Sequence, residues 1–315
     1  MTTTDSRLSD VRDELRTVGS PVVVFCKSHS GSRLMAQLIE GAGVYMGAHQ
    51  NESSDSLDLL RLVEHLVECY YPDYSSLWKT NGRDSELAAT TSIIRQVFAD
   101  HLSQIACLGD RWGWKLCETL YALPAIDFLF PEARYIHLIR DGRDVAFCNH
   151  TPPDTSFWKK VYFNTDRIET WQKHRLNYQN YHRRSHLFNA LHWVNSVRVA
   201  RNYGAMLRDR YLEVRYEDLC SNFESQAQRV LAHLGGACDR EVIERLQGSV
   251  HSRSVGKHRH EQRRKLNEVL QIEKSLLLEL GYLDADPFKG SSRSLKRRIR
   301  GLLSAWLSQK PCAVV

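Results

Sequence analysis

The chain has 315 residues, 42% hydrophobic and 25% charged, which suits one large globular domain or one domain with appendages. A formal net charge of +6 is a mild excess that favours anionic ligands and does not require a nucleic-acid partner, so we expect none. The eight cysteines form no CxxC pair and no zinc-spaced cluster with histidine, which predicts reduced thiols, a cytoplasmic protein and no metal site. The polar N-terminus predicts no signal peptide, and no apolar run is long enough to span a membrane.

The first 43 residues hold the most informative pattern. Residues 1–20 are polar and predict a lead-in of one or two helical turns. Val22–Phe25 then predict a short buried strand, a polar turn follows over Cys26–Ser32, and apolar residues recur from position 34 at helical spacing. This order forms an anion cradle, because the free N–H groups of the turn and the helix N-terminus carry partial positive charge. With Lys27, His29 and Arg33 as further donors, the expected ligand is phosphate or sulfate.

This turn differs from the phosphate-binding loop of kinases and ATPases. That motif ends in Gly-Lys-Ser/Thr, with the lysine on the phosphates and a hydroxyl on magnesium. Here Gly31 is followed by Ser32 and Arg33, so magnesium has no obvious first ligand. A tight strand–helix turn without any ligand is the plain alternative for this segment taken alone.

Later segments predict the rest of the fold. Apolar periodicity predicts mostly helix over 49–110, and Pro131 ends a further helix that begins at Leu120. Gly235 is the expected C-cap of a helix over Asn222–Leu234. Strands separated by helical segments predict a parallel sheet with right-handed crossovers. The remaining elements are strands at Trp112–Leu116, Tyr135–Ile139 and Tyr211–Tyr216, and a long helix over 186–208.

The C-terminal tail differs in composition from the rest of the chain. Over 291–308, lysine and arginine alternate with leucine, isoleucine and tryptophan at spacings that separate charged and apolar sides of a helix. Such a helix is able to lie on an anionic membrane surface, or it docks on the protein's own core with its arginines in solvent. We therefore expect three parts: the lead-in 1–20, a main domain 21–290 and the basic tail 291–315.

Three segments that follow predicted strands carry polar side chains. Arg140 begins the sequence RDGRD at a strand end, where parallel sheets bind ligands, and arginine donates to phosphate in pairs. The alternative is a helix start capped by Asp144, with its arginines in solvent. Lys115 ends a short strand and either reaches a transferring group or lies along the surface. Tyr216 ends another strand and either contacts a base or packs in the core.

In this order, the segments resemble the signatures of sulfotransferases that use 3′-phosphoadenosine 5′-phosphosulfate (PAPS). The strand–SGS–helix segment is similar to their 5′-phosphosulfate loop, YIHLIRDGRDVAF to their 3′-phosphate motif and VRYEDL to their third signature. The block WGWK…LFPEARYIHLIRDGRDVA is closest in style to bacterial and tyrosylprotein-type members. The resemblance covers roughly 21–235 and implies an α/β fold of the sulfotransferase type, a P-loop-like parallel sheet flanked by helices.

The resemblance implies roles for particular positions. The 3′-phosphate arginine falls on Arg140, the adenine-contacting tyrosine on Tyr216, and a lysine beside the sulfuryl group on Lys115. A loop that closes over the nucleotide falls near 249–265 and includes Ser254 and Lys257. The groups that hold the 5′-phosphosulfate fall on Ser28, His29, Ser30, Gly31, Ser32 and Arg33.

Three positions depart from the family pattern. His29 stands where lysine or arginine is usual, so either Lys27 substitutes in space or His29 carries the charge only at lower pH. Cys148 replaces a serine of the 3′-phosphate site and is a poorer hydrogen-bond partner. Cys117 stands where the cytosolic branch has a histidine base, which leaves a carboxylate as the base or a weak enzyme.

The reaction that the resemblance implies is in-line transfer of the sulfuryl group from PAPS to a hydroxyl or amine, with no metal. It needs a base and cations for the charge that develops on the bridging oxygen. We assign the cations to Lys27 or His29 and to Lys115. Glu52 is the expected base because it follows the loop's helix where tyrosylprotein-type enzymes place a glutamate, and His49 is the second choice.

The acceptor is expected to be a carbohydrate or a glycolipid, with an acidic peptide as a further option. Aromatic and basic residues crowd the stretch 150–190 and suit such an acceptor, although they equally suit helix packing. Two rival functions remain: another P-loop-like phosphotransferase, and a catalytically degenerate nucleotide-binding module. The aromatic residues in the stretch 150–190 that we expect near the acceptor are Trp158, Tyr162, Phe163, Trp171, Tyr178 and Tyr181.

Overall fold

The computed structural model describes residues 6–78, 84–103, 105, 111–149, 155–162, 173–177, 179–250 and 252–283. The chain divides into two units, Met1–Glu273 and Lys274–Val315. In the second unit the described residues complete helix α14 (Arg263–Glu279) and continue to Leu283. The predicted membrane-facing tail at 291–308 lies outside the described residues. Within them, no helix is both long and apolar enough to cross a membrane.

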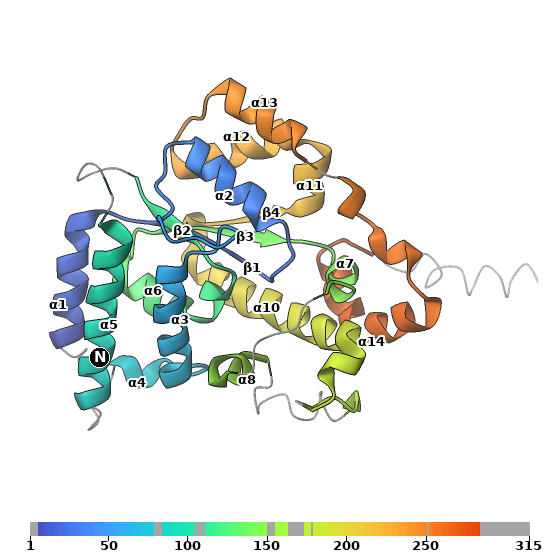
Figure 1. Ribbon diagram of the computed structural model, residues 1–315, viewed down its shortest axis with the longest axis horizontal. Helices are drawn as coiled ribbons and strands as arrows, with labels where there is room; N and C mark the ends of the chain where they lie inside the picture. The colour runs from blue at the N-terminus through green and yellow to red at the C-terminus, as the bar shows by residue number, and fades with distance from the viewer. Residues whose placement is uncertain are drawn as a thin grey trace, which may run out of the picture. The chain divides into compact units, whose positions relative to one another are not determined.

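The first unit is built on one sheet of four parallel strands in the order β2–β1–β3–β4 (Figure 1). The strands are β1 (Val22–Cys26), β2 (Gly113–Lys115), β3 (Arg134–Ile139) and β4 (Tyr211–Arg215). All five residues of β1 are buried, as expected of a strand covered on both faces. The predicted α/β class and parallel sheet are confirmed.

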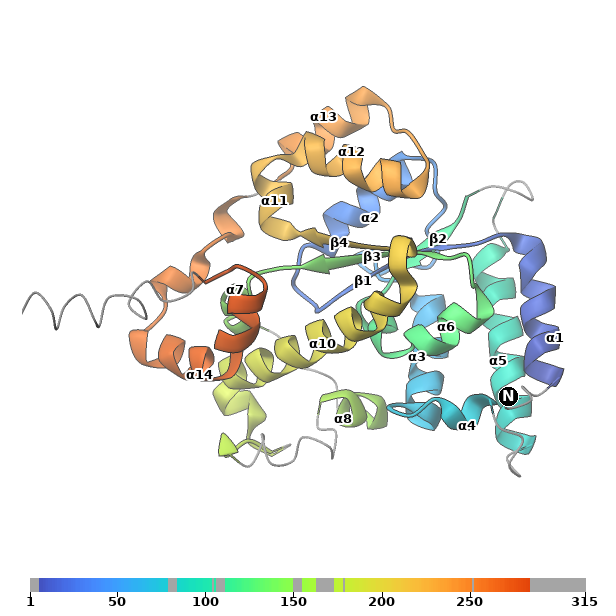
Figure 2. The same cartoon turned by 180° about the vertical axis from the view of Figure 1, so that it is seen from behind.

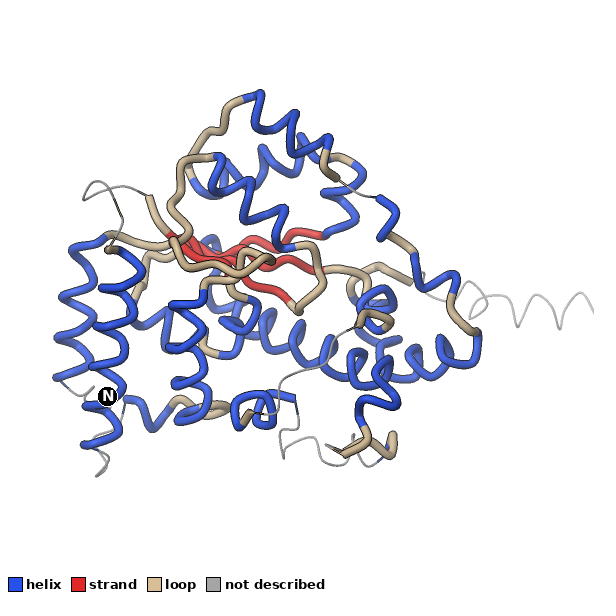
Figure 3. Tube along the Cα trace, in the orientation of Figure 1, coloured by secondary structure: helices blue, strands red, loops and turns tan. Residues whose placement is uncertain are grey.

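Helices cover both faces of this sheet, and successive residues of β1 point to different cores. Val22 and Val24 pack in one hydrophobic cluster with α2, α12 and α13, whereas Val23 and Phe25 pack in the other with α1, α3, α5, α6 and part of α10. Figure 2 shows the two layers from behind, and Figure 3 shows the strands between them. The helices are α1 (Ser6–Leu15), α2 (Ser32–Gly41), α3 (Leu57–Tyr70), α4 (Ser75–Trp78), α5 (Asp84–Leu102), α6 (Leu123–Leu129), α7 (Gly142–Ala146), α8 (Ser156–Tyr162), α10 (Ser185–Leu207), α11 (Tyr216–Ser221), α12 (Phe223–Leu234) and α13 (Arg240–Gly248).

Local signals explain several boundaries. Helix α12 ends at Gly235, whose left-handed backbone (φ 63°) forms the predicted C-cap. The helix expected from Leu120 is instead a 3₁₀ helix, η2 (Cys117–Tyr121), followed by α6 with a proline in its first turn. Proline suits that place because its missing N–H would have no helical partner there.

The N-terminal segment contributes more than the expected one or two turns. Helix α1 has ten residues, and Leu8, Val11 and Leu15 on one of its sides are all buried in the larger hydrophobic cluster. These positions recur at helical spacing, but the polar residues between them hide the pattern in a short window. The lead-in therefore forms part of the core.

The substitution Gly113→Ala tests how closely β1 and β2 are paired. A Cβ at this position would collide with the backbone carbonyl of Val22, its register partner. We expect Gly113→Ala to lower the free energy of unfolding by about 1–3 kcal/mol in urea denaturation, because the two strands must separate. Gly248→Ala at the end of α13 meets nothing within 4 Å and is the control. Equal effects of the two substitutions would contradict this account.

Candidate functional site

The carboxyl ends of β1, β3 and β4 bring three loops together. β1 leads into the first loop, Lys27–Gly31, β3 leads into Arg140, and β4 leads into Tyr216 at the start of α11. Open parallel sheets bind ligands at this edge. The first loop thus meets two segments that lie more than a hundred residues further along the chain, as the resemblance implied.

The first loop forms a tight turn against Tyr216. His29 (φ 72°) and Gly31 (φ 86°) adopt positive φ, and Gly31 is the N-cap of α2. A Cβ on Gly31 would collide with the Tyr216 ring, so only glycine fits under it. Ser30 is buried, and its hydroxyl donates to the Lys27 carbonyl at 2.6 Å, which fixes the turn. The backbone N–H groups at the start of α2 follow directly, with Ser32 as the first helical residue.

Lys27 is the least satisfied cation of the site. Its side chain is only 2% exposed, and its Nζ has no hydrogen-bond partner among the described residues. Burial lowers the pKa of Lys27, with partial compensation from nearby thiols and Glu118. An unpaired ammonium in a protein interior is costly, so a negatively charged group bound beside Lys27 would stabilise this side chain.

His29 does not replace the usual cation. Loss of hydration, and then the charges of Lys27, Lys257 and Arg140, lower the pKa of His29 to about 4, although its ring still reaches solvent. The imidazole is therefore neutral near pH 7 in the absence of a ligand. Ser28 is half-buried beside it.

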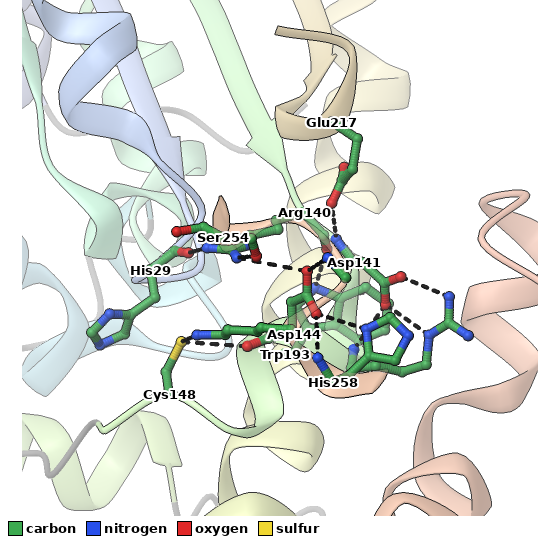
Figure 4. Close-up of polar contacts among 12 residues, drawn as sticks. His29, Arg140, Asp141, Asp144, Cys148, Trp193, Glu217, Ser254 and His258 are labelled. Atoms are coloured by element: carbon green, nitrogen blue, oxygen red, sulfur yellow. Dashed lines mark hydrogen bonds and ion pairs between the residues drawn. The ribbon is translucent and has the colours of Figure 1, made fainter. Parts of the chain in front are cut away.

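Arg140 links the first loop, the start of α11 and the loop near 249–265 that contains Ser254 and Lys257, called the late loop below. Its guanidinium donates to the carbonyl of His29 at 3.0 Å and to that of Ser254 (Figure 4). It also lies 4.8 Å over the centre of the Tyr216 ring. The side chain is 5% exposed, and its buried Nε has no partner among the described residues. Arg140 therefore offers one more donor to a ligand.

Asp144 fastens the late loop to this arginine. Its carboxylate accepts hydrogen bonds from the N–H groups of Gly256 and His258 at 2.7 and 3.0 Å and from the His258 ring at 2.6 Å. It also lies 3.6 Å from Arg140. Although burial opposes it, these donors lower the pKa of Asp144 to about 2. The carboxylate therefore holds the late loop as an anion at neutral pH (Figure 4).

Lys257 of the late loop lies beside Cys148, and both were predicted to hold the nucleotide. The Lys257 ammonium lies 3.2 Å from the Cys148 sulfur. The alternative in which Asp144 caps the helix does not hold, because Asp141 caps α7 by accepting the N–H of Arg143 at 3.0 Å. The four-residue spacing from Arg140 was the signal that could have placed Asp144 beside that arginine.

Glu217 and Trp193 hold the start of α7 in place, and sequence reasoning gave neither a role. The Asp141 N–H donates to the Glu217 carboxylate at 2.9 Å, and the Trp193 indole donates to the Arg140 carbonyl at 3.0 Å. Glu217 follows Tyr216 directly in the motif VRYEDL, which was the available signal. Trp193 lies inside α10 and gave no signal of its own.

Lys115 is buried but, unlike Lys27, it is paired. Its ammonium donates to the Asp55 carboxylate at 2.7 Å and to the Ser53 carbonyl at 2.9 Å. Burial opposes it, but the thiols of Cys117 and Cys26 and the Asp55 carboxylate together raise the pKa of Lys115 above its usual range. The lysine thus anchors the loop that carries Glu52. Asp55 was not predicted, because a contact across 60 positions leaves no local pattern.

The two expected bases lie in or beside this loop and reach solvent. Glu52 is exposed, and its backbone carbonyl accepts from the exposed Arg33 at 3.3 Å, which turns Arg33 toward the same loop. His49 is engaged by Asp58, with 3.0 Å between its Nδ1 and the carboxylate.

Glu118 is a carboxyl group that sequence reasoning missed. It lies in η2, is 9% exposed, and contributes to the electrostatic environment of both Lys27 and Lys115. Burial, followed by the neighbouring Cys117 and Asp55, raises the pKa of Glu118 to about 8. A carboxyl group with this pKa changes protonation near neutral pH, as general bases do.

The predicted acceptor region is described only in part. The side chains of Trp158 and Tyr162, and the whole of Phe163, Trp171 and Tyr178, lie outside the described residues, whereas Tyr181 is buried in a small hydrophobic cluster. His186, which belongs to the same region, stacks on Phe147 with parallel rings 6.0 Å apart. A cavity of about 650 Å³ opens here, lined by Lys173, His174, Arg175, Arg184, His186, Leu187, Gln262, Arg264, Lys265, Glu268 and Gln271.

Solved structures that are similar to this chain include several sulfotransferases, at low sequence identity. The sulfotransferase domain from the curacin biosynthetic pathway is 15% identical, with 82% of this chain and 97% of that chain covered and a TM-score of 0.44. A sulfotransferase from Mycobacterium avium is 11% identical, with 88% and 81% covered and a TM-score of 0.44. Retinol dehydratase, solved with androsterone and inactive cofactor PAP, is 14% identical, with 98% and 87% covered and a TM-score of 0.34.

The family assignment comes from the sequence itself. No curated protein matches the chain. The model of the sulfotransferase family matches residues 21–240, which include the whole sheet and all three strand-end loops. This match confirms the resemblance found in the motifs, and the chain belongs to the sulfotransferase family.

Proposed function

We propose that this protein transfers a sulfuryl group from PAPS to a hydroxyl or amine of an acceptor. The observation that carries the proposal is the buried Lys27 ammonium without a partner, at the end of β1 and next to the N-terminus of α2. A 5′-phosphosulfate bound in this loop would supply the missing negative charge. The unpartnered Nε of Arg140, at the end of β3, fits a second anionic group of the same ligand.

The remaining nucleotide contacts follow from the loops. Backbone N–H groups and hydroxyls over 28–33 hold the 5′ end, where Ser28, Ser30 and Ser32 lie. Arg140 holds the 3′-phosphate, with Lys257, Cys148 and Ser254 beside it. The Tyr216 ring packs on Gly31 and Arg140 at the same place, and it is the side chain that we assign to contact with adenine.

The chemistry needs a proton acceptor and stabilisation of the leaving group. The acceptor oxygen or nitrogen forms a bond to sulfur while the bond from sulfur to the bridging oxygen breaks. Lys27 and Lys115 stabilise the charge on that bridging oxygen. Glu52 takes the acceptor's proton, since Lys115 fixes its loop through Ser53 and Asp55. His29 is neutral and serves the phosphosulfate as a neutral donor.

The acceptor that we propose is a carbohydrate or a glycolipid. The basic cavity beside Phe147 supports an acceptor with a carboxylate, phosphate or sulfate group, because five of its lining side chains are lysine or arginine. Glu268 balances only part of this charge, through its contacts with Arg184, His186 and Arg264. Screening hydroxylated sugars with and without an acidic group tests this preference, and equal rates would remove it.

A nucleotide-binding module without turnover is the second candidate. It is favoured by the neutral state of His29 and by the engagement of Lys115 with Asp55. Of the three predicted reaction-site cations, all of which the structure describes, Lys27 then remains as the unpaired one. Such a module would bind the nucleotide as the enzyme does and transfer nothing from labelled donor.

Calorimetric titration with adenosine 3′,5′-bisphosphate, and in parallel with ATP and magnesium, tests the proposed function. We expect micromolar or tighter binding of the bisphosphate and little of ATP. Arg140→Ala is expected to weaken bisphosphate binding about a hundredfold, and adenosine 5′-phosphate much less, because a charged contact to the 3′-phosphate is lost. Arg210→Ala, which breaks an ion pair with Asp127, is the control. A preference for ATP with magnesium would make the protein a phosphotransferase.

Lys27→Met separates binding from folding. Because the buried ammonium has no partner in the free protein, its removal is expected to raise the free energy of unfolding by about 1–3 kcal/mol. The same change is expected to weaken bisphosphate binding about a hundredfold. Lys274→Met, at an exposed lysine, should change neither quantity. A destabilised variant with normal affinity would mean that Lys27 serves the fold.

The identity of the base follows from two substitutions. We expect Glu52→Gln to lower the transfer rate from labelled donor by about 10²–10⁴-fold with unchanged bisphosphate affinity, because a base must accept a proton. Glu118→Gln is the comparison. If Glu118 is the base, transfer falls with Glu118→Gln and activity declines as the pH falls through about 8, where its carboxyl becomes protonated. That result would overturn the assignment of Glu52.

A further inference from the structure

Two buried cysteines meet directly below the first loop. The Sγ atoms of Cys26 and Cys117 lie 3.2 Å apart, and both residues are buried, at 1% and 6% exposure. Cys26 is the last residue of β1, and Cys117 begins η2 just after β2. Both are free thiols that the proposed transfer reaction does not use.

The two side chains lie close enough for a covalent bond after a small movement. The register of β1 and β2 ends with Val24 opposite Lys115, so Cys26 and Cys117 each lie two residues beyond the last paired residues, and Cys117 already belongs to η2. A disulfide bond is about 2.05 Å long, and the two Sγ atoms lie 3.2 Å apart. A bond therefore requires the two side chains to move toward each other.

The pair also touches the anion cradle. The Cys117 sulfur lies 3.9 Å from the hydroxyl of Ser32, the first residue of α2, and Cys26 directly precedes Lys27. A movement of the Cys117 sulfur would therefore displace the Ser32 hydroxyl. A movement of Cys26 would displace Lys27, the next residue in the chain.

We propose that Cys26 and Cys117 form a reversible dithiol–disulfide site that weakens nucleotide binding by the first loop when oxidised. The effect on the nucleotide rests on the proposed function, whereas formation of the bond does not. The oxidant is a peroxide small enough to reach a nearly buried pair. The reductant that restores the site is a dithiol.

One molecule of hydrogen peroxide oxidises the two thiols in two steps. A Cys26 thiolate attacks one peroxide oxygen, the O–O bond breaks, and the released hydroxide takes the Cys117 proton to give the first water. The Cys117 thiolate then attacks the resulting sulfenic sulfur, and the S–O bond breaks. The second hydroxide takes the proton that Cys26 had released. Two thiols lose two electrons in total, and one hydrogen peroxide becomes two waters.

The electrostatics favour Cys26 as the first nucleophile. A hydrogen bond from the Cys117 thiol lowers the pKa of Cys26 despite its burial, and the charge of Lys115 acts in the same direction. The thiolate is the reactive form of cysteine, so this neighbour makes a buried sulfur oxidisable.

The test compares the full-length protein before and after stoichiometric hydrogen peroxide. Free thiols are alkylated, and the remaining disulfides are mapped by mass spectrometry. We expect one bond between Cys26 and Cys117, reversed by dithiothreitol, and absent from Cys117→Ser and from Cys26→Ser. Cys238→Ser, at a half-buried cysteine outside the site, should oxidise as the parent does.

Calorimetry with adenosine 3′,5′-bisphosphate then measures the effect on the loop. Oxidation is expected to weaken binding about tenfold in the parent and in Cys238→Ser, the size of one lost polar contact to an anion, and not in Cys117→Ser. By linkage, the bisphosphate should protect the two thiols from peroxide.

Two results would overturn the proposal. Absence of a bond between Cys26 and Cys117 removes the site, and unchanged affinity after its formation removes the effect on the loop. If the reduced protein itself does not bind the bisphosphate, the proposed function fails instead. The existence of the thiol site is then decided by the disulfide map alone.

Discussion

Three positive charges are buried at one edge of a parallel sheet, and the cost of withdrawing them from water determines how the surrounding loops are built. Lys27, Arg140 and Lys115 are each exposed by 5% or less. Lys115 has Asp55 as its counter-ion, and Arg140 has carbonyl partners with Asp144 nearby. Lys27 has no such group among the described residues. Among the described residues, the three cations are thus satisfied without a ligand except at the Lys27 Nζ and the Arg140 Nε, and an anion gains most at these two atoms.

Two carboxylates of the protein hold loops in place beside the site. Asp55 and Asp144 do not occupy the centre of the cradle; each ties a separate loop to a strand end. Asp55 joins the loop of Glu52 to β2 through Lys115, and Asp144 joins the late loop to α7. Since both loops are held in the free state, much of the ordering that a nucleotide would otherwise impose has already taken place, which favours binding by preorganisation.

The sequence predicted the elements that depend on local patterns and missed contacts that depend on distance along the chain. The apolar runs at Val22 and Tyr135 and the C-cap at Gly235 are local, and all were found where expected. The motif order placed Arg140 and Tyr216 at one sheet edge because parallel strands end on the same side. The pairing of Lys115 with Asp55 spans 60 positions, and that of Asp144 with Gly256 spans 112, so no window of residues contains either. Helix α1 was underestimated because its three buried residues are separated by charged ones.

The late loop has a consequence for the order in which the site is completed during synthesis. Every strand that the structure describes has been made once Arg215 is reached, so the sheet and most of its covering helices are available before Gly256 and His258 emerge. Until then, the Asp144 carboxylate lacks the three donors that hold it ionised in the interior. A chain interrupted between 220 and 255 would contain every described strand and all three signature segments, yet its Asp144 carboxylate would have Arg140 at 3.6 Å and none of its three late-loop donors. The last forty residues of the first unit thus decide whether the nucleotide end of the site is complete, although their described positions include no strand.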